Sequence, residues 1–259
     1  MSARRGWRRI VLAAVAAAAC GGGTEQQQPA KPANWTMVIG IDVSGSFRDA
    51  KLYDDAAEFA GYYLYAHLHG LGGLRVPTAV FVGPIGGARA SEPKPFHPIN
   101  DLQGRTVEQI ASDLRTWFPA TDTYTDFNAF FQRVSQLVKE RGLILAPLNV
   151  IVLSDGVPDV PPGARLVAGQ NPYSRIDLGP LEFLSRSVTV RLLYANPQVG
   201  ENWKRLIRHK RVRLWTQEWQ VMAGWHRQVK PGIQLERQDD LWKWVRDNVD
   251  FRARAGNLF

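Results

Sequence analysis

Hydrophobic and polar positions follow two alternating periodicities from residue 36 to the end of the chain. Short runs of apolar and β-branched residues predict strands, and longer stretches with apolar residues at every third or fourth position predict helices. The predicted strands are 36–41, 78–82, 148–153, 188–194 and 212–216, the last at an edge of the sheet. The predicted helices are 54–68, 106–118, 126–139 and 203–209, with a short one after 179 and a final one opened by Asp239 and Asp240.

This order of elements predicts the fold class. Strands separated by helices favour an α/β domain, doubly wound, with a mostly parallel sheet and helices on both faces. The proline-containing stretch 89–103 is predicted to be a surface excursion, and 156–179 a long loop. In such sheets, ligands bind beyond the carboxyl ends of the strands, where the strand order reverses. Polar residues that directly follow the predicted strands are therefore the first candidates for a site.

The first 34 residues differ in composition, and we expect them to lie outside the domain. Four arginines precede an unbroken apolar run, 10–19, which leads into the chain's one cysteine, Cys20. This pattern is typical of an export signal, and the run is too short to span a bilayer, which needs about 20 apolar residues. The Ala-Ala-Ala-Cys-Gly sequence resembles a bacterial lipobox. The alternatives are a plain secretory signal cut nearby and a buried free thiol.

The lipobox resemblance implies a three-part organisation. Residues 1–19 would be a lipoprotein signal peptide, and Cys20 would be lipidated in the bacterial cell envelope. Residues 20–34 lack bulky apolar side chains and are predicted to be a flexible tether. Residues 35–259 would form one domain with a tryptophan-rich C-terminal segment. The protein would then be lipid-anchored to the bilayer, at the outer membrane or the periplasmic face of a membrane.

Charge and cysteine content exclude two classes of protein. Residues 1–19 hold four arginines and no acids, so their removal lowers the formal net charge from +8 to +4. The remaining chain is mildly basic, and we expect no nucleic-acid partner. One cysteine also excludes a scaffold held together by intramolecular disulfides.

Three short stretches carry the candidate chemistry. An Asp-x-Ser-x-Ser sequence follows the first predicted strand, a Thr-Asp pair opens the predicted helix 126–139 with its threonine as N-cap, and an Asp-Gly pair follows strand 148–153. Oxygen-only ligands of this kind suit hard divalent cations. Because both aspartates that follow strands can point into one crevice, the stretches predict a shared metal site. The candidate ligands are Asp42, Ser44, Ser46, Thr125 and Asp155.

Together the three stretches resemble the metal-ion-dependent adhesion site (MIDAS) of a von Willebrand factor A (vWA) domain, over about residues 35–215. The resemblance implies that the two serines and the threonine supply hydroxyl ligands, and that the two aspartates bind the ion directly or through water. Mg²⁺ is the expected cofactor, with Mn²⁺ or Ca²⁺ as substitutes. Thr123 is the alternative to Thr125. Tyr124, Asp126 and Asp159 are candidates for supporting the ligands or touching a partner.

These observations predict a membrane-anchored binding module, not an enzyme, that engages an acidic group of a protein partner through its metal. One alternative is a Mg²⁺-dependent phosphohydrolase of the haloacid dehalogenase type. That chemistry needs a second carboxylate two residues after the nucleophile, where Ser44 stands. The other alternative is a metal-free envelope scaffold held by the tryptophan-rich end and the basic segment 204–213. We expect these tryptophans to pack in the core: Trp203, Trp215, Trp219, Trp225, Trp242 and Trp244.

Overall fold

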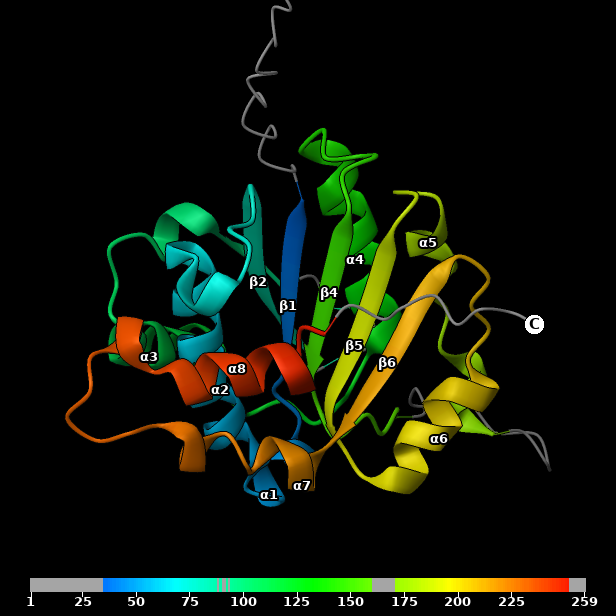
Figure 1. Cartoon of the computed structure of the whole chain (residues 1–259). Coiled ribbons are helices and arrows are strands. Elements are labelled where there is room, and N and C mark those ends of the chain that lie inside the picture. The colour runs from blue at the N-terminus through cyan, green and yellow to red at the C-terminus, as the bar shows by residue number, and fades with distance from the viewer. Residues whose placement is uncertain (1–34, 88, 90–91, 93, 160–170, 252–259) are drawn as a thin grey trace, which may run out of the picture. The chain divides into compact units, whose positions relative to one another are not determined.

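A computed structural model of the chain describes residues 35–87, 89, 92, 94–159 and 171–251 (Figure 1). The predicted signal peptide, the tether and Cys20 lie outside the described residues. Within the described ranges, no helix is both long enough and apolar enough to cross a membrane.

A six-stranded sheet lies at the centre of the domain, in the order β3-β2-β1-β4-β5-β6 (Figure 1). Neighbouring strands are parallel except for the antiparallel pair β2 and β3. The chain winds outward from β1 in one direction and from β4 in the other, so the strand order reverses between β1 and β4. The prediction of a doubly wound, mostly parallel α/β sheet is confirmed. The strands are β1 (Thr36–Asp42), β2 (Ala79–Ile85), β3 (His97–Pro98), β4 (Leu148–Leu153), β5 (Val188–Ala195) and β6 (Val212–Glu218).

Helices cover both faces of this sheet, as predicted. The face covered by α2, α3, α7 and α8 buries one hydrophobic cluster, and the face covered by α4, α5 and α6 buries another. The α-helices are α1 (Gly45–Asp49), α2 (Leu52–His69), α3 (Val107–Trp117), α4 (Phe127–Glu140), α5 (Gly179–Glu182), α6 (Pro197–Leu206), α7 (Trp219–Met222) and α8 (Asp239–Asn248). Short 3-10 turns are η1 (Leu71–Gly73), η2 (Ile99–Asp101), η3 (Pro172–Arg175), η4 (His226–Gln228) and η5 (Leu235–Arg237).

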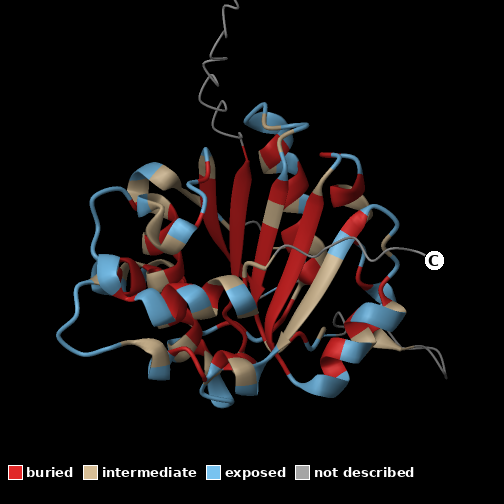
Figure 2. Ribbon diagram, in the orientation of Figure 1, coloured by how far each residue is buried: buried red, intermediate tan, exposed pale blue. Residues whose placement is uncertain are grey.

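The central strands are mostly apolar because both of their faces are buried (Figure 2). In β1, Met37 and Ile39 pack on the α2 face, whereas Val38 packs on the α4 face. Gly40 lets α4 approach the strand, since a Cβ there would lie 2.4 Å from the ring of Phe130. The strand that carries the candidate site is thereby clamped between two packed layers.

Two predicted elements are wrong in their bounds or content. The helix predicted at 203–209 is α6, which begins at Pro197 and ends at Leu206. Its start signal is Asn196, whose side chain accepts a hydrogen bond from the backbone N–H of Val199, followed by a proline at the first helical position. The excursion 89–103 contains β3 and η2, which seat its end against β2.

The predicted core role of the tryptophans holds for part of the set. Trp203, Trp225 and Trp242 are fully buried. Trp219 is 41% exposed, so for this residue the prediction is wrong. The basic segment 204–213 has its Lys and Arg side chains exposed.

Candidate metal centre

Asp42 is the last residue of β1 and is fully buried. Its Oδ1 accepts a hydrogen bond from the backbone N–H of Ser44 at 2.9 Å. Its Oδ2 accepts one from the Ser154 hydroxyl, at the end of β4, at 2.5 Å. These two bonds fix the orientation of the carboxylate and tie the ends of the two central strands together.

The turn from β1 into α1 brings the two serines of the Asp-x-Ser-x-Ser sequence together. Ser44 is buried and immediately precedes α1, whereas Ser46 lies in its first turn and is exposed. Their Oγ atoms are 3.2 Å apart. The Ser46 hydroxyl also lies close enough to the carboxylate of Asp155 to lower its pKa. The structure therefore brings Asp42, both serines and Asp155 to one place at the carboxyl end of the sheet.

Short-range hydrogen bonds from backbone N–H groups to side-chain oxygens hold the turn after β4. Asp155 Oδ1 accepts a hydrogen bond from the backbone N–H of Val157 at 3.0 Å, and the N–H of Gly156 donates to Ser154 Oγ at 2.9 Å. Gly156 has φ of +77°, and a Cβ there would lie 2.6 Å from Leu192, so a glycine is required. Its carbonyl accepts a 2.7 Å bond from the indole N–H of Trp203.

Thr125 reaches this region from the loop before α4. Its backbone N–H donates to Asp159 Oδ2 at 2.7 Å, which joins the loop to the segment after Asp155. Thr125 is 2% exposed, and its hydroxyl has no hydrogen-bond partner among the described residues. The alternative, Thr123, is exposed. A buried hydroxyl without a partner favours Thr125 over Thr123 as a metal ligand.

The N-cap predicted for α4 is wrong by one residue. Asp126 is the N-cap, and its Oδ1 accepts a hydrogen bond from the backbone N–H of Ala129 at 2.9 Å. Asp126 therefore has a structural role in starting α4, which leaves the Thr125 hydroxyl uncommitted. Tyr124 is 8% exposed, and burial raises the pKa of its hydroxyl to about 12.

Two residues near the site were missed by the sequence reasoning. Ser154 lies beside the recognised Asp-Gly pair but drew no attention, although it donates to Asp42. Asp122 pairs with Ser44 in an isolated β-bridge, and its Oδ2 lies 3.1 Å from Lys94 Nζ. The only signal for Asp122 was its place in the same loop as Thr125, so sequence spacing alone did not distinguish it.

The two central carboxylates lack a positively charged neighbour. Burial raises the pKa of Asp42 to about 7, with the charge of Asp155 adding to the effect and hydrogen bonds from Ser154 and Ser44 opposing it. Burial also raises the pKa of Asp155, against hydrogen bonds from the Val157 backbone and the Ser46 hydroxyl. Neither aspartate takes part in an ion pair within the described part of the chain. A cation would relieve this arrangement.

These residues fit a hard divalent cation. Their donors are carboxylate and hydroxyl oxygens, the ligands that Mg²⁺ and Ca²⁺ prefer. No cluster of three His, Cys, Asp or Glu side chains that could hold a metal occurs in the ranges that the structure describes. The fit therefore depends on the hydroxyls as well as the carboxylates.

No protein-family model and no curated protein sequence matches the chain. It is similar to the solved structure of proximal thread matrix protein 1 from the mussel byssus, with a TM-score of 0.44 and 13% identity over 80% of this chain and 48% of that one. It is also similar to the pilus adhesin SpaC from Lactobacillus rhamnosus GG, with a TM-score of 0.44 and 12% identity over 82% of this chain and 30% of that one. For the human COPII-coat protein Sec24c, the TM-score is 0.46 and the identity 10%, over 84% of this chain and 32% of that one. The chain thus spans half or less of each.

The structure itself places the Asp-x-Ser-x-Ser turn at the carboxyl end of β1, beside the reversal of strand order. The fold is α/β, with a six-stranded, mostly parallel sheet and helices on both faces. In this doubly wound domain, the candidate ligands lie where such sheets bind their ligands.

Proposed function

We propose that the chain is a binding module that holds a divalent cation, Mg²⁺ first, and uses it to engage a carboxylate of a protein partner. The proposed ligands are Asp42, Ser44, Ser46, Thr125 and Asp155. One observation supports this most strongly: oxygens from separate stretches meet at one end of the sheet, and the two carboxylates among them have no cationic partner in the part of the chain that the structure describes.

The charges of these side chains suit the capture of an acidic group. The hydroxyl ligands are neutral, and with one or both carboxylates acting through water, a bound divalent cation keeps attraction for one further anionic oxygen. Ser46 is exposed, which puts one edge of the site at the surface where a partner can reach it. When bound, the cation would supply the Lewis acidity that holds the partner's carboxylate.

The phosphohydrolase alternative is less well supported. Both carboxylate oxygens of Asp42 accept hydrogen bonds, and the residue is fully buried. A carboxylate nucleophile needs an oxygen free to attack its substrate. Ser44, which stands where the general acid would be required, binds Asp42 through its backbone N–H instead. These contacts favour binding over catalysis.

The membrane anchor remains a second part of the proposal. Lipidation of Cys20 would hold the domain at the bacterial cell envelope, on the outer membrane or at the periplasmic face of a membrane. Cys20 lies outside the described residues, so this part depends on the sequence pattern alone. Mass spectrometry of the N-terminal peptide from membranes checks it directly.

The metal is tested by the melting temperature of the purified chain with Mg²⁺, Mn²⁺ or Ca²⁺, against NaCl of equal ionic strength. We expect a metal-dependent rise that Asp42→Ala abolishes. Thr125→Val removes an unpaired buried hydroxyl, so it should leave the metal-free fold intact, or about 1 kcal/mol more stable, while weakening the metal response. Thr123→Val, on an exposed neighbour, is the matched control and should respond like wild type.

Partner binding is tested separately, by affinity capture from envelope extract with and without EDTA. We expect a captured protein that is lost with EDTA and with Asp42→Ala. A wild-type chain that responds to none of the three metals contradicts the metal site. Capture that survives both EDTA and Asp42→Ala contradicts the metal-dependent mode of binding.

A further inference from the structure

A second set of polar side chains lies at the opposite end of the sheet, on the face that α2 and α8 cover. In the strand register, Asn149 of β4, Thr189 of β5 and Arg213 of β6 are side by side. Two residues further along, Arg191 of β5 pairs with Trp215 of β6. Positions of this face are otherwise apolar in the central strands, so polar residues here require an explanation.

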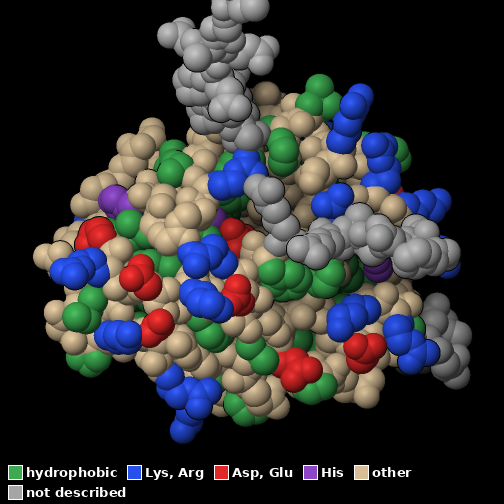
Figure 3. All heavy atoms as spheres, viewed as in Figure 1, with side chains coloured by type: hydrophobic (Ala, Val, Ile, Leu, Met, Phe, Trp, Pro, Cys, Tyr) green, Lys and Arg blue, Asp and Glu red, His purple; other side chains and the backbone are tan. Residues whose placement is uncertain are grey.

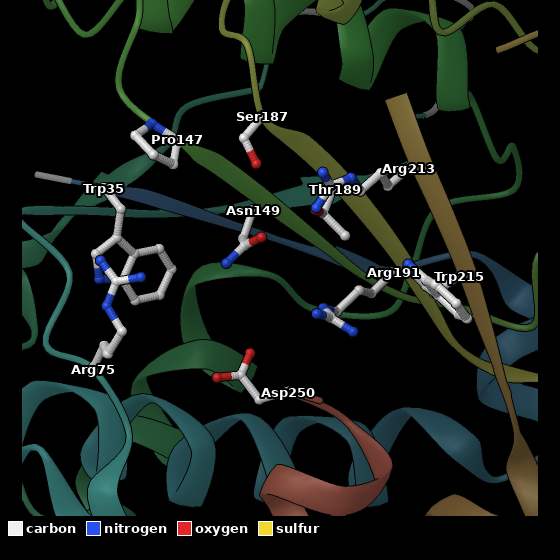
Figure 4. A pocket seen from close by; sticks show the side chains of 10 residues that line it. All are labelled: Trp35, Arg75, Pro147, Asn149, Ser187, Thr189, Arg191, Arg213, Trp215 and Asp250. Atoms are coloured by element: carbon white, nitrogen blue, oxygen red, sulfur yellow. The ribbon is translucent and has the colours of Figure 1, made fainter. Parts of the chain in front are cut away.

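These side chains line a cavity of about 250 Å³ near the amino ends of β4, β5 and β6 (Figure 4). Asp250, which follows α8, lines it from the opposite side, and Trp35 and Arg75 close one flank. A water molecule occupies about 30 Å³ of liquid, so the cavity has room for several waters or for a small organic ion. It is too small for most drug-sized ligands, whose pockets span roughly 300–1,000 Å³.

Arg191 is the decisive group in this cavity. It is only 6% exposed, and Figure 4 shows its guanidinium directed into the space between Asn149 and Asp250. Its Nη2 donates to the carbonyl of Phe251 at 2.9 Å, whereas its Nε and Nη1 have no hydrogen-bond partner among the described residues. A buried charge with unpaired donors is strongly unfavourable unless a ligand or ordered water satisfies it.

The one acidic group of the lining does not neutralise Arg191. Asp250 Oδ1 accepts a hydrogen bond from the Tyr63 hydroxyl at 3.2 Å, and its Oδ2 lies 3.6 Å from His67 Nε2. No ion pair joins Asp250 to Arg191 within the described part of the chain, although both line the same cavity. Within the described residues, the guanidinium therefore faces the cavity without an ion-pair partner, with the centroid of the Phe251 ring 5.3 Å from its Cζ.

The lining as a whole carries a net positive charge and contains further hydrogen-bond donors. Three arginines and one carboxylate line the cavity, so its net charge is positive. The indole Nε1 of Trp215 is a further buried donor without a partner among the described residues. Elsewhere on this face of the molecule, Lys and Arg side chains are scattered and mixed with Asp and Glu (Figure 3). The unpaired donors of Arg191 and Trp215 therefore lie in a cavity whose lining is positive overall, unlike the mixed charges of the surface around it.

We propose that this cavity is a binding site for a small oxyanion, a carboxylate or phosphate group, with Arg191 as its principal ligand. Charge-assisted hydrogen bonds from a guanidinium to such groups are among the strongest in proteins. Asn149 and Thr189 supply neutral polar groups for the remainder of the anion. The site is independent of the metal centre, which lies at the other end of the sheet.

Isothermal titration of the full chain with inorganic phosphate, and separately with succinate, tests the site against chloride of equal ionic strength. We expect at least one of the two to bind, and Arg191→Gln to weaken that binding at least tenfold. Arg205→Gln removes the same charge from an exposed position on α6, on the other face of the sheet, and should bind like wild type. Asp42→Ala should also bind like wild type, which separates this site from the metal centre.

A second measurement does not depend on a variant. The side-chain Nε–H resonance of Arg191 in wild-type protein should shift and exchange more slowly with solvent when the anion is added. Binding of phosphate alone, or of succinate alone, identifies which oxyanion the site prefers. The proposal is overturned if neither phosphate nor succinate releases or absorbs more heat than chloride does. It is also overturned if the Arg191→Gln variant binds the anion with the same affinity as wild type, and in either case the cavity holds water only.

Discussion

The two ends of the sheet hold buried ionisable groups of opposite kind, carboxylates at one end and a guanidinium at the other. At the carboxyl end, neither Asp42 nor Asp155 has an ion-pair partner among the residues that the structure describes. At the amino end, Arg191 faces a cavity, again with no ion-pair partner in the described part of the chain. Because an unpaired buried charge is unfavourable, each end indicates the sign of what it binds. The comparison indicates that one sheet can place two proposed ligand sites, one for a cation and one for an anion, at its opposite ends.

The two ends also differ in how they hold their charged groups. Backbone N–H groups of Ser44 and Val157 donate to the carboxylates, so turns built by the chain prepare the carboxyl end. The guanidinium at the amino end projects from within a strand and gives one hydrogen bond, to the carbonyl of Phe251. We therefore expect the metal centre to be largely preformed. The cavity should depend more on its ligand for order.

The largest effect is expected from Asp42→Asn in metal-free protein above pH 7. Burial raises the pKa of Asp42 from 3.8 to about 7, so ionised Asp42 opposes folding by on the order of 4 kcal/mol. Asparagine keeps the shape without the charge, and the free energy of unfolding should rise by about 2–4 kcal/mol, while the response to Mg²⁺ disappears. Urea unfolding with and without Mg²⁺ measures both effects.

Asp126→Asn is the matched control for this substitution. Asparagine caps helices as well as aspartate does, so its unfolding free energy should change by less than about 0.5 kcal/mol and its metal response should persist. If Asp42→Asn destabilised the metal-free protein instead, the buried carboxylate would be a structural hydrogen-bond acceptor. The assignment of Asp42 to a metal would then lose its electrostatic support.

A smaller effect, which concerns the carboxyl end alone, follows from pH. The folded-state pKa of Asp42 is raised above its unfolded value, so the metal-free protein holds a proton there that the unfolded chain has lost. The contribution of Asp42 to the free energy of unfolding is therefore most favourable at low pH, and it falls as pH rises from about 4 to about 7. Mg²⁺ must displace that proton, so its affinity should rise about tenfold per pH unit below about 7 and then level off.

Calorimetric titration with Mg²⁺ at several pH values measures this dependence. A Mg²⁺ affinity that stays constant between pH 5 and pH 8 would show that the proton on Asp42 does not compete with the metal.

One part of the candidate site at the carboxyl end was visible in the sequence because that part is local. Asp42, Ser44 and Ser46 lie within five residues, directly after an apolar run that marks a strand end. Ser154 escaped notice because a serine in a turn is ordinary and its bond to Asp42 joins residues 112 positions apart. The cap at Asp126 was misplaced because threonine and aspartate both cap helices, and only the structure separates them.

The cavity at the amino end has no comparable pattern in the sequence. Its polar side chains come from alternate positions of different strands and from Asp250, a residue beyond α8. Arg191 is a single charged residue within the apolar strand 188–194, and the sequence alone gives it no partner. Only the strand register shows that it lies beside Trp215. The fold was predictable because strand and helix periodicities are strong, whereas β3, with two residues, is too short to leave a periodic signal.

The smallest expected effect concerns communication between the two ends. Arg191 pairs through Ile151 with Ile39, three residues before Asp42, so the two backbone positions are roughly 14 Å apart by strand geometry. Residues at that separation, with no shared hydrogen-bond partner, should have stability effects that add to within about 0.5 kcal/mol. A double-mutant cycle of Asp42→Ala with Arg191→Gln measures the coupling.

The comparison pair for this cycle is Asp42→Ala with Ser154→Ala, two residues joined by a 2.5 Å hydrogen bond. Its coupling should be about 1 kcal/mol or more, because residues in contact do not act independently. A coupling of that size between Asp42 and Arg191 would show that the two proposed sites are not independent. Since β4 lies between β1 and β5 and bonds to both, any such coupling must pass through or around that strand. A further cycle at Ile151, which pairs with both Ile39 and Arg191, would then show whether β4 transmits it.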